Sequence, residues 1–151
     1  MSIITNPTIE QIYDTFKMVC THLRFKCSTD INAASSGDIG ANQITDSYLF
    51  YLRSRTQIAA FYQYPGLAEF AANVEAIPGY DLDAEITTLL AAIDASTAWI
   101  EANFPTSNGW ILAAALDSGI TWRQFTTAQT AGLVTELADI VAAIDARTSV
   151  I

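Results

Sequence analysis

The stretch "ITTLLAAIDASTAWI" (Ile86–Ile100) decides the fold, because the chain repeats its pattern as "LADIVAAIDARTSVI" (Leu137–Ile151). In both copies apolar residues recur at i, i+3, i+4 and i+7, the spacing of a helix with one buried face. The alanines beside each stripe favour helix and leave room for a close neighbour. The repeat therefore predicts two similar helices, 86–103 and 127–148, packed side by side as the core pair.

Two aspartates, Asp94 and Asp145, hold equivalent positions in the copies, each directly after an isoleucine of the stripe. One residue further along a helix is about 100° around it, so both carboxylates are expected at the flank, near solvent. A catalytic carboxylate pair needs a shared geometry and a perturbed environment. The sequence supplies neither, and we interpret the repeat as structural.

Three more helices are predicted upstream of the core pair, from apolar spacing and from Pro-Gly breaks. They cover about residues 8–27, 46–62 and 66–77. The segment "WILAAALDSGITWRQF" instead has two short runs around Asp117-Ser118-Gly119, which predicts a β-hairpin. Thr126 with Gln129 then forms a capping box that opens the last helix. The predicted fold is mainly α, with four to five helices and one β-hairpin inserted before the C-terminal helix.

The chain of 151 residues is expected to form a single helical domain, 1–151. Within it, residues 28–43 mix small and polar side chains with two glycines, which predicts a flexible loop. Loops of this length are commonly functional or disordered. A further possibility is that the segment becomes ordered only against a neighbouring subunit.

The composition is apolar, with 51% hydrophobic and only 15% charged residues, which suggests burial against other subunits. The N-terminus does not resemble a secretory signal, and no run is long enough for a membrane helix. The net charge of −9 argues against general nucleic-acid binding. Residues 56–122 hold eight acids and no Lys or Arg, whereas residues 1–55 are neutral. This asymmetry either serves solubility or orients one subunit against the next.

Few residues could carry chemistry. His22 is the single histidine, and on a helix it lies about 200° from Cys20, so these two and Cys27 cannot converge on one metal. The two cysteines are too far apart on a helix for a disulfide with each other, and two buried thiols are expected. No phosphate-binding glycine loop or nucleophile motif is present. We therefore expect no catalytic residue, no metal and no cofactor.

Aromatic residues and arginines crowd the segment "YLFYLRSRTQIAAFYQY" (Tyr48–Tyr64). They circle the predicted helix, which fits either a helix buried on several sides or one with a face against another subunit. Stacking on nucleic acid is a weaker alternative because of the net charge. The interface candidates are Tyr48, Tyr51, Arg53, Arg55, Phe61, Tyr62, Tyr64, Trp110 and Trp122.

Two motifs in the second half resemble a group of small, uncharacterised tailed-bacteriophage virion-associated proteins. These show W-I-x-x-N-F-P at a helix end and F-T-x-A-Q-x-A-G-L at the start of the last helix. Here the motifs are Trp99–Pro105 and Phe125–Leu133, and the similarity covers about residues 44–148. The motifs describe caps, stops and turns and carry no chemistry. The resemblance implies a virion component without fixing its place in the virion.

The expected function is a non-enzymatic structural component of a tailed-phage virion, repeated at the head–tail connection (neck) or tail. The alternatives are a capsid-decorating protein and a cytoplasmic phage adaptor that never enters the particle. The expected partners are other virion proteins and further copies in a symmetric homo-oligomer, with no direct nucleic-acid binding and no membrane. The expected location is the virion, assembled in the bacterial cytoplasm.

Overall fold

The computed structural model describes residues 9–36, 39, 41–63, 66–76, 78–79, 81–104, 106–107, 110–111 and 127–148. Within these residues most of the chain is helical, so the predicted mainly α fold is confirmed. The elements are α1 (Ile9–Ser35), α2 (Ala41–Ala60), the 3₁₀ turn η1 (Phe61–Gln63), α3 (Leu67–Glu75), α4 (Leu82–Asn103), β1 (Thr106–Ser107), β2 (Trp110–Ile111) and α6 (Thr127–Thr148).

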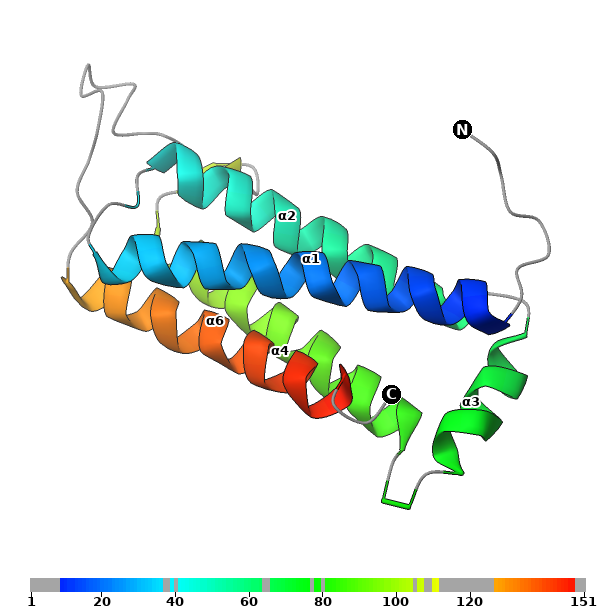
Figure 1. Cartoon of the computed structure of the whole chain (residues 1–151). Coiled ribbons are helices and arrows are strands. Elements are labelled where there is room, and N and C mark those ends of the chain that lie inside the picture. Colours follow the sequence, from blue (N-terminus) through cyan, green and yellow to red (C-terminus); the bar gives the residue numbers. More distant parts are fainter. Residues whose placement is uncertain are drawn as a thin grey trace.

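The four long helices form a bundle in which each runs antiparallel to its neighbours (Figure 1). Around the bundle, α1 contacts α2, α2 contacts α4, α4 contacts α6, and α6 contacts α1. The short helix α3 lies across one end, between the end of α2 and the start of α4. Up-and-down packing of this kind buries one stripe of each helix in a shared core.

The core pair predicted from the repeat is confirmed, because α4 and α6 pack against each other along their length. The Ser96 hydroxyl, which is buried in α4, donates to the Glu136 carbonyl of α6 at 3.0 Å. Both repeated stripes lie in the core, as Ile86, Leu89, Ile93 and Ile100 in α4 and as Leu137, Ile140 and Ile144 in α6.

The two motifs that carry the resemblance meet in space. Trp99 of α4 packs against Gly132 of α6, and its ring meets that of Phe104 edge-on at 5.7 Å between centroids. Gln129 Nε2 donates to the Asn103 carbonyl at the end of α4, at 2.6 Å. The motif residues therefore join the end of α4 to the start of α6, which gives them a structural role.

The flexible loop predicted over residues 28–43 is wrong for most of its length, because α1 continues to Ser35. The buried side of the helix continues through Asp30 and Ala34, and Tyr51 of α2 donates a hydrogen bond to the Asp30 carboxylate. Packing against the bundle thus overrides the weak helix propensity of the Ser, Thr, Asp and Asn residues in this segment.

The start of the second helix was also predicted too late. The helix was predicted from about residue 46, whereas α2 begins at Ala41 and Ser47 is buried inside it. Ile44, one turn before Ser47, lies in the core and extends the buried face of the helix. Five residues, 36–40, therefore join α1 to α2, within the range of short connections in antiparallel bundles.

For the helix predicted over 86–103 the sequence offers Asp81 or Asp83 as the capping residue, and α4 begins at Leu82. The Asp81 side chain caps the helix by accepting from the Ala84 amide at 3.0 Å. After α4, β1 and β2 pair antiparallel, with Thr106 opposite Ile111 and Ser107 opposite Trp110. The hairpin predicted around Asp117-Ser118-Gly119 and the Thr126 cap fall on residues 112–126, which lie outside the described residues.

Candidate protein-interaction surface

A stripe of α1 leaves large side chains on the outside of the bundle. Met18 and Phe25 are 52% and 74% exposed, and His22 lies between them on the same face. The buried stripe of α1 runs through Cys20 and Leu23 instead. Phe25 is the most exposed large apolar side chain of the described residues, so packing among these residues does not explain this face.

Helix α2 supplies the other wall of this surface. Phe50 lies beside His22 and Phe25, and Arg53 and Gln57 continue the wall toward Met18. The Arg53 guanidinium sits 6.0 Å above the Phe50 ring, at the edge of cation–π range. We call this surface the α1–α2 groove; its residues are Met18, Val19, His22, Phe25, Lys26, Phe50, Arg53 and Gln57.

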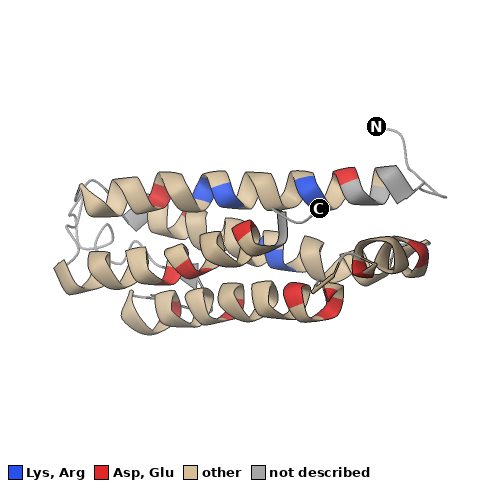
Figure 2. Cartoon of the chain, turned by 60° about the horizontal axis from the view of Figure 1, so that its bottom comes forward, with Lys and Arg blue, Asp and Glu red and all other residues tan. Residues whose placement is uncertain are grey.

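The groove is mostly apolar next to Phe25, where it has a volume of about 360 Å³, and mixed in character next to Arg53 and Gln57. Lys26 and Arg53 line the groove, and Lys26 pairs with the buried Asp30 at 3.2 Å. Lysines and arginines concentrate on α1 and α2, whereas α3 and α4 carry acids and no base (Figure 2). The groove is therefore an exposed, partly apolar surface with Arg53 at its edge.

Three interface candidates from the sequence belong to the core instead. Tyr48, Tyr51 and Phe61 are buried within the single chain, which corrects their assignment to an intersubunit surface. Helix α2 lies between α1 and α4, so aromatic residues on several of its sides face neighbouring helices. The alternative of a helix buried on several faces is the one that the structure supports.

The remaining candidates have mixed positions. Arg53 lies in the α1–α2 groove, and Arg55 pairs with Asp94 within the chain. Tyr62 is partly exposed, at 37%. Tyr64, the side chain of Trp110 and Trp122 lie outside the described residues.

The sequence did contain a pattern that identifies the groove. Met18 and Phe25 are seven residues apart, which places them on one side of α1, away from the buried stripe. Such a second apolar stripe indicates a surface that packs outside its own core. The interface predicted from sequence lay instead in the aromatic-rich residues 48–64, and the sparser pattern in α1 went unrecognised.

The repeated aspartates form equivalent ion pairs. Arg24 of α1 binds Asp145 of α6, with Nε 2.7 Å from Oδ1, and Arg55 of α2 binds Asp94 of α4, with Nε 2.9 Å from Oδ1. The hydrogen bond from Arg24 lowers the pKa of Asp145. Both carboxylates lie at the bundle surface, as predicted, and each links two helices.

A buried polar cluster joins α1 to α2. The Tyr51 hydroxyl donates to Asp30, which also accepts from Lys26 Nζ at 3.2 Å, and the Cys27 thiol lies beside the same hydroxyl. Burial, together with the charge of Asp30, raises the pKa of Cys27 to about 12. Burial likewise raises the pKa of Tyr51 above its usual range. Both groups stay protonated at neutral pH, so the cluster holds the two helices in register and offers no nucleophile.

Among the described residues, no three His, Cys, Asp or Glu side chains are placed to bind one metal ion together. Cys20 and Cys27 are buried thiols outside any disulfide, as predicted, whereas His22 points to the exposed side of α1. His22 thus lies on a different side of α1 from the two cysteines.

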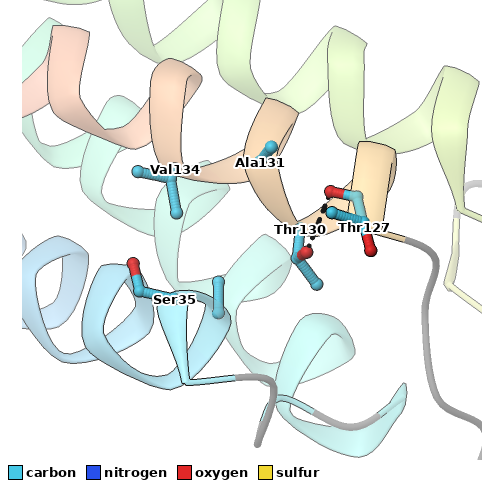
Figure 3. A pocket seen from close by; sticks show the side chains of 6 residues that line it. Ser35, Thr127, Thr130, Ala131 and Val134 are labelled. Atoms are coloured by element: carbon cyan, nitrogen blue, oxygen red, sulfur yellow. Dashed lines mark hydrogen bonds between the residues drawn. The ribbon is translucent and has the colours of Figure 1, made fainter.

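A second pocket, of about 360 Å³, lies where α1 ends and α6 begins (Figure 3). Its lining is small and uncharged, and its hydroxyls come from Ser35, Thr127 and Thr130. The Thr130 hydroxyl donates to the Thr127 carbonyl at 3.1 Å. None of the described residues of this lining is titratable, so these residues offer neither an acid, a base nor a charged ligand contact.

Across the described residues, no helix is long and apolar enough to cross a membrane. Comparison with protein-family models, with curated proteins and with solved structures finds no match to this chain.

Proposed function

We propose that this protein is a non-enzymatic assembly subunit of a tailed-bacteriophage particle, repeated at the head–tail connection or in the tail. The observation that carries the proposal is the α1–α2 groove, where Met18 and Phe25 are exposed on an otherwise well-packed bundle. Exposed apolar surface rimmed by polar side chains is typical of protein–protein contact sites.

Support for a phage particle comes from the resemblance in Trp99–Pro105 and Phe125–Leu133. Trp99 and Gly132, one from each motif, pack against each other. The motifs thus describe how this bundle closes, and a protein that shares them is expected to share the packing of α4 on α6. The virion role itself is inferred from the group that the motifs resemble.

Structural roles for the ionisable groups support an assembly protein over an enzyme. Asp94 and Asp145 each neutralise an arginine from a neighbouring helix. Cys27 and Tyr51 are buried with raised pKa values and have no open cavity beside their reactive atoms in the residues described. In the part of the chain that the structure describes, no Asp, Glu, Cys or Tyr lines the groove beside His22.

Mass spectrometry and cryo-electron microscopy of purified particles test the proposal. We expect the chain in the particle at six or twelve copies for a neck ring, or at a larger repeat number for the tail. Hundreds of copies on the shell would favour the capsid-decorating alternative. Absence of the chain from purified particles, combined with its presence in infected cells, would refute a virion role and favour the cytoplasmic adaptor.

A further inference from the structure

Helix α2 carries one acid and one base on either side of Phe50, at the α1–α2 groove. Asp46 lies one turn before Phe50 and Arg53 lies one turn after it, and both charged side chains are exposed. Seven residues along a helix amount to nearly two whole turns, so Asp46 and Arg53 share one face of α2. Among the described residues neither side chain forms an ion pair. Within that part of the chain, both charges remain available to a partner.

The two charges are arranged symmetrically about the apolar centre of the groove. The midpoint between positions 46 and 53 falls next to Phe50, which lies beside Phe25 of α1. Lys26 does not disturb this pattern, because it already pairs with the buried Asp30 at 3.2 Å. A stripe that reads acid, aromatic, base in one direction reads base, aromatic, acid in the other. Two copies of α2 that run antiparallel therefore place each acid opposite the base of the other copy.

We infer that the α1–α2 groove binds the same groove of a second copy, about a twofold axis that passes next to Phe25 and Phe50. The axis crosses the helices, so that α1 lies antiparallel on α1 of the second copy and α2 lies antiparallel on α2. Asp46 of each copy then faces Arg53 of the other. Such a contact is isologous and closes at two copies. This inference goes beyond the proposed function, because it holds whether or not the chain enters a particle.

Helix α1 fits the same arrangement. Phe25, which is 74% exposed, lies close to the axis, so its ring packs near the same ring of the second copy. Asp14 lies eleven residues before Phe25, and antiparallel packing sets it opposite a point about as far beyond Phe25 in the second copy. There the exposed residues are Ser35 and Ser36, so Asp14 meets no acid of the described residues. Aromatic side chains at the centre with charges toward the rim are typical of protein–protein interfaces.

The face formed by α1 and α2 is large enough for a dimer. The helices have 27 and 20 residues, so they are about 40 and 30 Å long and together cover about 600 Å² in projection. The accessible area of side chains exceeds this projection, and stable interfaces bury about 800 Å² per partner. Asp46 and Arg53 lie five and seven residues from the two ends of α2, so nearly the whole helix overlaps its counterpart.

Sedimentation velocity and light scattering on the purified full chain test the inference with charge reversals. Asp46→Lys leaves two bases on this face of α2 and Arg53→Glu leaves two acids, so each variant meets itself with like charges. The double variant, Asp46→Lys with Arg53→Glu, inverts the pattern and restores both pairs. The matched control is Asp139→Lys, which makes the same charge change at an exposed position of α6. Circular dichroism confirms that each variant is folded.

A second pair of variants tests the apolar centre. Phe25→Ser removes the aromatic side chain that lies nearest the axis. Its control, Leu52→Ser, removes an apolar side chain of α2 that is 38% exposed and does not line the groove.

We expect the mass of the wild-type chain to rise with concentration from 16.4 kDa to twice that value and no further. Asp46→Lys, Arg53→Glu and Phe25→Ser should each weaken dimerisation at least about tenfold at low salt. The double variant, Asp139→Lys and Leu52→Ser should dimerise like the wild type. An equal mixture of Asp46→Lys and Arg53→Glu should form a heterodimer, because the bases of one copy meet the acids of the other.

Four results would overturn the twofold contact. They are a wild-type chain that stays monomeric at every concentration, growth beyond the dimer, a double variant no stronger than the single charge reversals, and a dimer that none of the variants weakens. The first would leave the groove to a different protein, and the last would place the dimer contact on another surface. Particle analysis is independent of all four, because a monomeric chain found in purified particles keeps its virion role and loses only this contact.

Discussion

Replacing Gly132 by Ala tests whether the contact between α4 and α6 depends on a missing side chain. A Cβ at Gly132 would lie 2.2 Å from Trp99 Cζ2 and 2.9 Å from its Cη2, whereas carbon atoms pack best at about 3.5–4.0 Å. The indole must therefore shift by more than about 1 Å. Such a shift disturbs its edge-on packing against Phe104.

The expected cost combines three contributions. Overpacking a well-filled site costs about 1–3 kcal/mol, and a disturbed aromatic pair costs about 0.5–1.5 kcal/mol. Ala in place of a helical Gly returns about 1 kcal/mol. We expect Gly132→Ala to lower the free energy of unfolding by about 1–3 kcal/mol, which lowers Tm by about 3–10 °C. Urea titration and thermal melting followed by circular dichroism measure both quantities.

Two controls separate the clash from helix propensity. Ala142→Gly, at an exposed position of the same helix, should cost about 1 kcal/mol and so calibrates the propensity difference in α6. In a Trp99→Leu background, Gly132→Ala should become neutral or stabilising, because the atoms that it meets are gone. A variant Gly132→Ala more stable than wild type, or equally costly in both backgrounds, would refute the reasoning.

Three other outcomes follow from side chains in the bundle. Ser47 Oγ is buried and has no hydrogen-bond partner among the described residues, so Ser47→Ala should raise the free energy of unfolding by about 1 kcal/mol in urea titration; a loss of stability would contradict this account. The folded-state pKa values of Cys27 and Tyr48 are both raised to about 12, so the protonated forms stabilise the fold. This contribution is complete below about pH 9 and declines as the pH rises toward 12, and Tm measured across this range should fall, whereas a flat profile would exclude the effect. Asp94→Asn and Asp145→Asn should each leave Tm within about 3 °C and leave self-association unchanged, because both ion pairs are solvent-exposed; loss of association would mean that a carboxylate serves the interface.

The core of the fold could be predicted from periodicity alone. The stripes of Ile86–Ile100 and of residues 137–148 run as i, i+3, i+4 and i+7 and occupy the bundle core as expected. The start of α4 was also predictable, because a capping aspartate acts within one turn of its own position. These features depend on residues close together in sequence.

The boundary errors come from interactions that are distant in sequence. Residues 28–35 have weak helix propensity, and Asp30 reads as a loop residue until Tyr51, 21 positions later, supplies its hydrogen bond. The interface candidates failed for the same reason. Whether Tyr48 faces a subunit or a neighbouring helix depends on Glu101 of α4, which accepts a hydrogen bond from its hydroxyl. Local sequence gives the chemistry of such a side chain but not its partner.

The repeat lies in the second half of the chain, whereas the residues of the groove lie in the first half. Each copy of the repeat places an aspartate beside its buried stripe. In the antiparallel bundle Asp94 of α4 faces α2, and Asp145 of α6 faces α1. The same sequence pattern therefore makes equivalent contacts in both helices, because their surroundings in the bundle are equivalent. These contacts are made within the chain. Helices α1 and α2 supply the arginines of these ion pairs. On their outer sides the two helices meet at Phe25 and Phe50, and no element among the residues described covers this place. Under the proposed function, the groove that binds a neighbour belongs to the half of the chain that is not repeated, and substitutions of its exposed side chains Met18 and Phe25 should alter assembly with little change in the stability of the bundle.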